Sequence, residues 1–153
     1  MKRILLPTAI LLCAFVLSGP VTFGQGARSG PDPSTIRDPE LEEDSQHNLE
    51  VARLYFKLKK AYVAAIKRCE EIIAGNPNFA KMDEVLFIAG QSSLRLAENK
   101  GKQSSKLTPD QLRDDARTYL TQLVNDYPQS SFAKEAEEVL QGMGGPKKAE
   151  DKQ

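Results

Sequence analysis

The side chains that most often bind metal or act as nucleophiles are scarce in this 153-residue chain. It has one histidine, His47, and two cysteines, Cys13 and Cys69, that are far apart in the sequence. A protein metal site usually needs three or four ligands, and no second His or Cys lies near His47. Cys69 falls in the middle of an apolar helical stripe, where a free cysteine behaves as a small hydrophobic residue. We therefore expect no metal site.

Acidic residues and glycines do not form a catalytic pattern either. The acidic pairs Glu70–Glu71 and Glu137–Glu138 fall on predicted solvated helix faces rather than in a cleft. The glycines between Gly142 and Gly145 follow no strand and precede no helix, so they do not form a phosphate-binding loop. Catalysis would need a nucleophile with a base, paired carboxylates in a cleft or a metal cluster. The sequence therefore predicts no enzyme activity and no cofactor.

The formal charge excludes the usual nucleic-acid binder. Twenty-one Lys and Arg residues balance 21 Asp and Glu residues, so the net charge is zero. A protein that binds phosphate backbones normally carries a basic excess. With 27% charged residues and no Trp, the composition is typical of a helical interaction domain.

The N-terminus has the three parts of a secretory signal peptide. Met1 to Arg3 is basic, residues 4–17 (ILLPTAILLCAFVL) are mostly apolar, and small residues follow. Cleavage after Gly24 or Gly26 fits this pattern, and we predict a signal peptide over residues 1–26. The alternative is a membrane-anchoring or buried helix. The apolar run is shorter than the roughly 18–20 residues that a membrane span needs.

Cys13 raises the question of a lipid anchor. Bacterial lipoproteins are cleaved just before a cysteine that then carries lipid, and the signal places a small residue before that cysteine. Here Leu12 stands in that place, and apolar residues continue beyond Cys13. The pattern favours an apolar signal-peptide residue, so lipid anchoring at Cys13 is not expected.

The chain after the predicted signal peptide reads as a flexible linker, a helical domain and a tail. Residues 27–38 are rich in Pro, Ser, Gly and Asp and should form the linker. Residues 39–142 show only helical periodicity, and residues 143–153 should be a disordered tail. The expected helices cover residues 39–58, 61–74, 79–97 and 109–126, followed by a last helix capped by Ser130 or Ser131.

Start and stop signals define these helices. Asp38 can cap the first helix, and Pro39 suits its first turn. Thr108, Pro109 and Gln111 form the pattern of a capping box at the start of the fourth helix. Asn76–Pro77 and Tyr127–Pro128 should end the second and fourth helices, because proline cannot continue a helix.

Two helical segments repeat with a constant offset of 51 residues. Ala65 matches Ala116, Cys69 matches Leu120, and Ile72 matches Leu123. The tetratricopeptide repeat has a 34-residue period with small and apolar residues at such offsets and a closing proline. The excess residues lie mainly in the polar segment 98–107, which reads as an inserted loop.

Small residues should mark the close approach of helices within each repeat. Gly90 stands in the middle of the third helix, where glycine costs roughly 1 kcal/mol relative to alanine. Ala52 has the corresponding place in the first repeat. The fold class is therefore all-α, with antiparallel helical hairpins of a tetratricopeptide-like repeat in an α-α superhelix. We expect about two repeats and a C-terminal capping helix; an unrelated bundle of four or five helices is the alternative.

The amino-acid sequence of the first repeat is more specific than the general repeat pattern. Residues 47–96 include the runs HNLEVARLYFK and AYVAAI, followed by LFIAGQSSLRL. These runs resemble the BamD family of outer-membrane assembly lipoproteins, and the resemblance covers about residues 38–142. It implies a non-enzymatic subunit of the machinery that inserts β-barrel proteins into the outer membrane. It also implies protein partners, namely periplasmic domains of the central barrel subunit and other envelope proteins.

The chain departs from the family in two ways. Family members are typically lipoproteins with about five repeats, whereas this chain has a poor lipid-attachment signal and room for two repeats. We interpret it as a short form that is exported to the periplasm and associates with the outer membrane through partners. The alternative function is a generic exported tetratricopeptide scaffold in cell-envelope or cell-wall assembly, because a fold alone does not specify its partner.

Partner binding is expected on the first helix of each repeat, because stacked hairpins present these helices on one concave surface. The residues in register with Ala52 and Gly90 are the predicted groove residues: Gln46, Leu49, Arg53, Phe56, Lys57, Phe87, Gln91, Leu94 and Arg95. Arg53 and Phe56 are the strongest candidates, since Arg and aromatic side chains dominate interface energies. Phe56 could equally be a core residue. Tyr55, Tyr62 and Tyr119 are expected to pack between helices.

Overall fold

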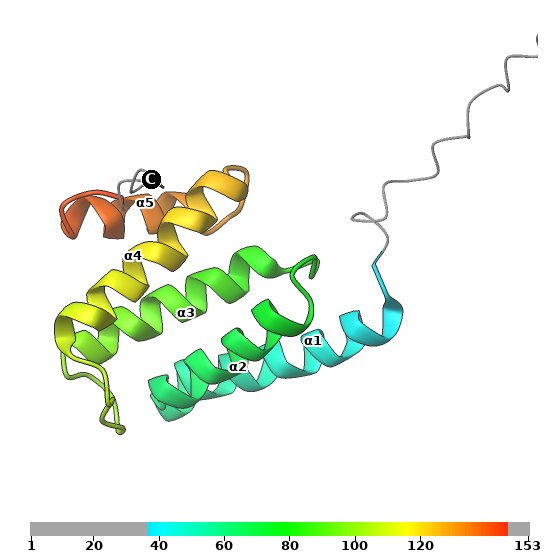
Figure 1. Cartoon of the computed structure of the whole chain (residues 1–153), viewed down its shortest axis with the longest axis horizontal. Helices are drawn as coiled ribbons and strands as arrows, with labels where there is room; N and C mark the ends of the chain where they lie inside the picture. Colours follow the sequence, from blue (N-terminus) through cyan, green and yellow to red (C-terminus); the bar gives the residue numbers. More distant parts are fainter. Residues whose placement is uncertain (1–36, 147–153) are drawn as a thin grey trace, which may run out of the picture. The chain divides into compact units, whose positions relative to one another are not determined.

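The computed structural model describes residues 37–146, which lie within one compact unit of the chain. The predicted signal peptide with Cys13, linker residues 27–36 and tail residues 147–153 lie outside the described residues. The described part contains helices and no strand (Figure 1). Its elements are α1 (Pro39–Arg53), the π-helical segment η2 (Leu54–Lys59), α2 (Tyr62–Gly75), α3 (Met82–Ala97), α4 (Pro109–Asp126) and α5 (Ala133–Gly142).

The helices pack as consecutive antiparallel neighbours. α1 and η2 form a hairpin with α2, α3 forms the next hairpin with α4, and α5 packs on α4 (Figure 1). The matched residues of the two repeats all lie in the core: Ala65, Cys69 and Ile72 on α2, and Ala116, Leu120 and Leu123 on α4, are at most 2% exposed. The prediction of an all-α fold built from tetratricopeptide-like hairpins is confirmed.

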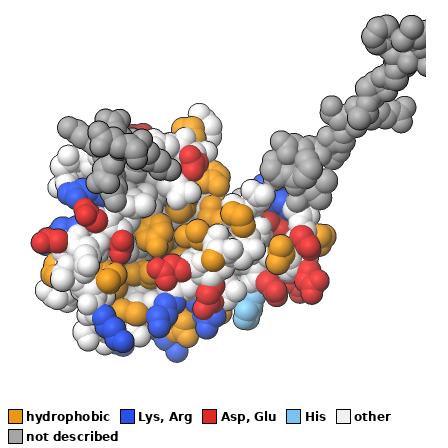
Figure 2. Space-filling model, in the orientation of Figure 1, with side chains coloured by type: hydrophobic (Ala, Val, Ile, Leu, Met, Phe, Trp, Pro, Cys, Tyr) orange, Lys and Arg blue, Asp and Glu red, His pale blue; other side chains and the backbone are white. Residues whose placement is uncertain are grey.

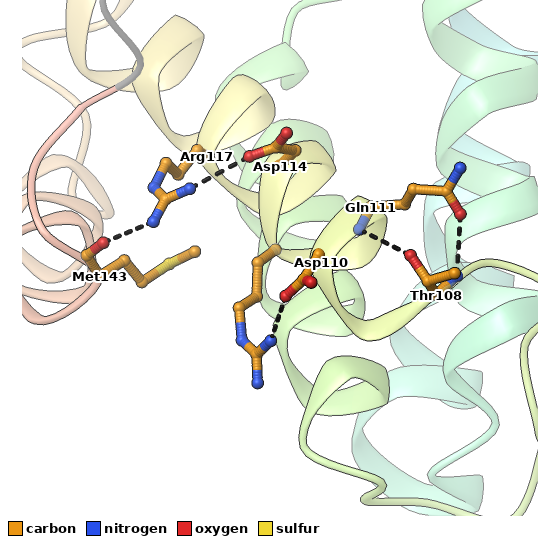
Figure 3. Close-up of polar contacts among 7 residues, drawn as sticks. Thr108, Asp110, Gln111, Asp114, Arg117 and Met143 are labelled. Atoms are coloured by element: carbon orange, nitrogen blue, oxygen red, sulfur yellow. Dashed lines mark hydrogen bonds and ion pairs between the residues drawn. The ribbon is translucent and has the colours of Figure 1, made fainter.

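The predicted start signals operate as expected at two helices. The Asp38 carboxylate accepts a hydrogen bond from the backbone N–H of Glu40 at 2.9 Å, at the start of α1. At α4, the Gln111 N–H donates to Thr108 Oγ1 and the Thr108 N–H donates to Gln111 Oε1, which completes the capping box (Figure 3). These contacts satisfy backbone donors that the first helical turn leaves unpaired.

Three details differ from the sequence prediction. The first helix does not stay α-helical to its end, and its last part forms the π-helical segment η2. The chain then reverses at Lys60, whose backbone is in a left-handed conformation with φ 51°. α3 begins at Met82 rather than Phe79, because residues 76–81 form turns in which Phe79 is itself buried. α5 begins at Ala133 rather than directly after a serine cap. Ser130 Oγ accepts the N–H of Phe132 but also donates to Asp83 on α3.

The inserted loop, residues 98–107, is anchored on the first hairpin. The Lys102 N–H donates to the Lys60 carbonyl, and Gly101 lies so close to Tyr62 that an added Cβ would be 2.6 Å from its ring. The Gln103 side chain accepts a hydrogen bond from the Ala64 N–H in the first turn of α2. Because α2 has no side-chain cap of its own, the loop supplies one from the next repeat.

None of the helices between residues 37 and 146 is long and apolar enough to cross a membrane.

Candidate partner-binding surface

Three of the nine predicted groove residues are buried. Leu49 is 0% exposed, Gln91 6% and Phe87 8%. Phe87 stacks on Phe132, which immediately precedes α5, with ring centroids 4.8 Å apart. Most of α3 is enclosed, because it packs against both α2 and α4. The expectation that these three side chains line an open groove is therefore corrected: they are packing residues.

Two further predicted residues, Gln46 and Arg53, connect the first helices of the two repeats. Arg53 Nε and Nη2 donate to the two carboxylate oxygens of Glu84 on α3, at 2.6 and 2.5 Å. Lys81 Nζ donates to Gln46 Oε1 at 2.8 Å, and Gln46 Nε2 donates to Glu50 at the same distance. These side chains have partners in the next repeat, so they hold the repeats together.

In the Arg53–Glu84 pair, each partner shifts the pKa of the other. The hydrogen bond from Arg53 lowers the pKa of Glu84, and the hydrogen bond to Glu84 raises the pKa of Arg53. Partial burial opposes both changes, since it disfavours each charged form. The two-point geometry also fixes the rotation of α1 against α3, because a guanidinium fits a carboxylate in one plane.

The side chain of Phe56 is partly buried and partly exposed. Its side chain is partly buried against both apolar clusters of the domain, and its ring lies 5.9 Å from that of Tyr62. Tyr55 and Tyr119 pack against the larger cluster and Tyr62 is buried, as predicted. Lys57 and Arg95 are exposed. Phe56 therefore supports the fold and keeps an accessible edge.

Leu94 is the predicted groove residue that borders a hollow. The hollow has a volume of about 540 Å³, and we call it the α5 hollow. It is lined by side chains of α3, α4 and the end of α5: Leu94, Glu98, Arg113, Arg117, Val139, Gly142 and Met143. Sequence reasoning did not assign α4 or α5 to the binding surface, because their residues lie outside the first-helix pattern.

Hydrogen bonds orient the two arginines of the α5 hollow, and those of Arg117 are shown in Figure 3. Arg117 donates to the Met143 carbonyl at 2.6 Å and to Asp114 at 3.1 Å, and Arg113 donates to Asp110 at 2.8 Å. The bond to Met143 ties the end of α5 to the middle of α4. The hollow thus combines apolar walls with two guanidinium groups and with the carboxylate of Glu98, which is paired with Lys100. Apolar walls next to guanidinium groups suit a peptide segment with an apolar side chain and a nearby carboxylate.

Cys69 has the surroundings of a structural residue, and His47 is a surface residue. Cys69 is 0% exposed, and burial raises the pKa of its thiol to about 12, so the reactive thiolate is suppressed. His47 is exposed on α1. Among residues 37–146, no group of three or more His, Cys, Asp or Glu side chains could hold a metal ion.

A model of a protein family described as an outer membrane lipoprotein matches residues 49–144, which is more than half of the chain. The matched segment begins at the buried Leu49 near the end of α1 and ends just beyond α5, so it includes the last turn of α1, all the later helices and the α5 hollow. No curated protein and no solved structure matches the chain.

Proposed function

We propose, from the premise that the chain belongs to the YfiO family of outer membrane lipoproteins, that it is a non-enzymatic scaffold of the cell envelope. In this proposal it binds partners of the β-barrel assembly machinery from the periplasmic side and so assists the insertion of outer-membrane proteins. Family membership supports a location in the envelope and a role in protein–protein interaction. The role in β-barrel assembly and the short form with two repeats go beyond what family membership supports, and they are part of the proposal.

The observation that carries a binding role is the α5 hollow. Its apolar residues Leu94, Val139 and Met143 lie next to Arg113 and Arg117, and Leu94 belongs to the predicted groove. Interface energy concentrates where an apolar anchor and arginines lie together in a pocket. We propose that a partner segment inserts an apolar side chain beside Leu94 and places a carboxylate near Arg113. Phe56, Lys57 and Arg95 would extend this contact along the first helices.

The test is an affinity pull-down from envelope membranes with the full chain as bait. Wild type should recover the central barrel-assembly subunit, and Leu94→Ser should reduce that recovery about tenfold, the effect of losing roughly 1.4 kcal/mol of binding energy. Arg113→Ala should reduce it by a smaller factor, because Arg113 is partly solvated and paired with Asp110.

Matched controls are available elsewhere on the same chain. Leu41→Ser removes a leucine that is 42% exposed on α1, and Arg68→Ala removes an arginine that is paired with Glu71 on α2. Neither control should change recovery of the barrel-assembly subunit. Recovery of cell-wall enzymes alone would reject the proposed machinery and favour the generic envelope scaffold. Equal losses in the Leu94 and Leu41 variants would reject the α5 hollow as the site.

A further inference from the structure

The charges of the domain are segregated although the net charge of the chain is zero. Residues 57–60 and 98–107 together contain six lysines and one glutamate, a formal charge of +5. We call the surface formed by these two segments the basic edge. At the start of α1, residues 37–44 contain five acidic residues and one arginine, a formal charge of −4.

The two segments of the basic edge are held together by the anchored loop. The hydrogen bond from Lys102 to the Lys60 carbonyl, the contact of Gly101 with Tyr62 and the bond between Ala64 and Gln103 join them. Figure 1 places the end of η2, the start of α2 and the loop on the lower side of the view. In Figure 2, basic side chains gather along this side with apolar side chains between them.

Exposed leucines occur among these lysines. Leu58 is 75% exposed and lies in the sequence between Lys57 and Lys59, with Lys60 next. Leu107, directly after Lys106, is 46% exposed, and Leu54 is 40% exposed one turn before Leu58. A protruding apolar side chain among lysines buries little of its surface within the fold. It suits an interface where the apolar group enters a hydrocarbon boundary while the ammonium groups stay at the polar surface.

We infer that the basic edge docks on an anionic phospholipid surface, with Leu58 and Leu107 entering the headgroup–acyl boundary. The charge is complementary to acidic headgroups, and a fluid surface accepts separated leucines without a shaped pocket. An acidic protein would satisfy the lysines but would need complementary cavities for both leucines. The inference goes beyond the proposed function, because its leucines and lysines do not line the α5 hollow and it requires no protein partner.

The test places an environment-sensitive nitrobenzoxadiazole label on the full chain and adds vesicles. A Cys13→Ala background leaves Cys69, whose burial and raised pKa protect it from labelling. Single Leu58→Cys and Leu107→Cys variants carry the label on the basic edge, and Glu43→Cys carries it at the acidic start of α1.

The fluorescence emission of labels at positions 58 and 107 should shift to shorter wavelengths and increase in intensity when vesicles of phosphatidylglycerol and phosphatidylethanolamine are added. They should not respond to pure phosphatidylcholine, and the response should disappear in high salt. The label at 43 should respond to neither. Replacing Lys57, Lys59 and Lys60 by Gln should raise the lipid concentration for half-maximal response roughly a hundredfold, about fivefold for each lysine. Lys134→Gln, on α5, is the single-lysine control and should leave it unchanged.

Circular dichroism should confirm that each variant folds; if the triple variant does not, Lys102→Gln with Lys106→Gln replaces it. A fluorescence change of the label at position 43 without one at position 58 would overturn the inference. An equal fluorescence change of the labels at positions 58 and 107 with phosphatidylcholine vesicles would also overturn it. Absence of any vesicle response at 58 and 107 would also overturn it and would favour an acidic protein on this edge. The pull-down result is separate, because its variants Leu94→Ser and Arg113→Ala change the α5 hollow and leave the lysines and leucines of the basic edge in place.

Discussion

The backbone of Gly90 on α3 lies directly against the side chain of Leu120 on α4. A Cβ added at Gly90 would be 2.7 Å from both Cγ and Cδ2 of Leu120, and 3.4 Å from the Ala116 carbonyl. Leu120 is 0% exposed, so it lies within the core. The sequence prediction that Gly90 marks a close helix approach is therefore confirmed.

Gly90→Ala should destabilise the domain despite the better helix propensity of alanine. Overpacking a filled core costs about 1–3 kcal/mol, which exceeds the roughly 1 kcal/mol that alanine contributes in a helix. Urea denaturation followed by circular dichroism measures the change. Gly75→Ala is the control, because no atom would lie within 4 Å of its new Cβ, and it should not destabilise. In a double-mutant cycle, Leu120→Ala should reduce the cost of Gly90→Ala; additive effects would contradict the contact.

The Arg53–Glu84 pair should contribute stability that depends on pH. Glu84→Gln should cost about 1 kcal/mol, between the values for exposed and buried ion pairs, because these side chains are 29% and 14% exposed. The folded-state pKa of Glu84 is lowered, so its contribution is fully present above the ordinary carboxyl pKa of 4.5. It is lost as the pH falls through the lower pKa of the folded state.

Urea denaturation of wild type and Glu84→Gln at several pH values checks this dependence. The difference in unfolding free energy should be largest at neutral pH and should shrink under acidic conditions. Glu71→Gln is the matched control, because Glu71 pairs with Arg68 in an exposed geometry and should change stability by less than about 0.5 kcal/mol. A difference for Glu84→Gln that grows on acidification would contradict the assignment.

Local sequence signals predicted the hairpins well because their causes are local. Helical periodicity placed Ala65, Cys69 and Ile72 in the core, and the Thr108–Gln111 capping box set the start of α4. The groove prediction was less successful, because the burial of Phe87 depends on Phe132, which is 45 residues away in the sequence. A register argument along one helix cannot identify what covers that helix from elsewhere in the chain.

The same limit applies to η2 and the inserted loop. A propensity pattern does not distinguish the last turn of an α-helix from a π-helical turn, because the apolar spacing over Leu54–Lys59 fits both. The polar composition of residues 98–107 indicates a loop, but its contacts with Lys60, Tyr62 and Ala64 are tertiary. The α5 hollow was not predicted from the sequence for a similar reason, since α4 and α5 contribute most of its lining.

Gln103→Ala should loosen the first turn of α2. The Gln103 side chain accepts the Ala64 N–H at 3.2 Å across the repeat boundary, and its loss leaves that donor to water. Because the bond is exposed, the expected cost is about 0.5–1 kcal/mol. Hydrogen exchange at the Ala64 amide should accelerate, whereas exchange in α5 should not change. Gln129→Ala, in an exposed turn after α4, is the control; the same acceleration at Ala64 in that variant would reject the capping role.

Cys13 should not carry lipid, even though the family includes lipoproteins. Leu12 is larger than the small residue that a lipid-attachment signal places before its cysteine, and the apolar run continues after Cys13. Metabolic labelling with palmitate should give equal, background incorporation in wild type and Cys13→Ala. Incorporation that is present in wild type and lost in the variant would overturn this prediction. Cys69→Ala is the control for labelling at the other cysteine.

Phe56 is a packing residue that is also a predicted binding residue. Its side chain contacts both apolar clusters, and its ring lies against Tyr62 at the junction of the two hairpin helices. Phe56→Ala should therefore lower the unfolding free energy by about 2–3 kcal/mol, somewhat less than a fully buried phenylalanine. Leu58→Ala lies in the same π-helical segment but removes a side chain that is 75% exposed, and it should change stability by less than about 0.5 kcal/mol. Urea denaturation compares the two variants directly.

A Phe56→Ala protein that retains wild-type stability and loses its partner in the pull-down would show that Phe56 serves binding alone. Loss of stability with retained binding would assign it to the core of the first repeat.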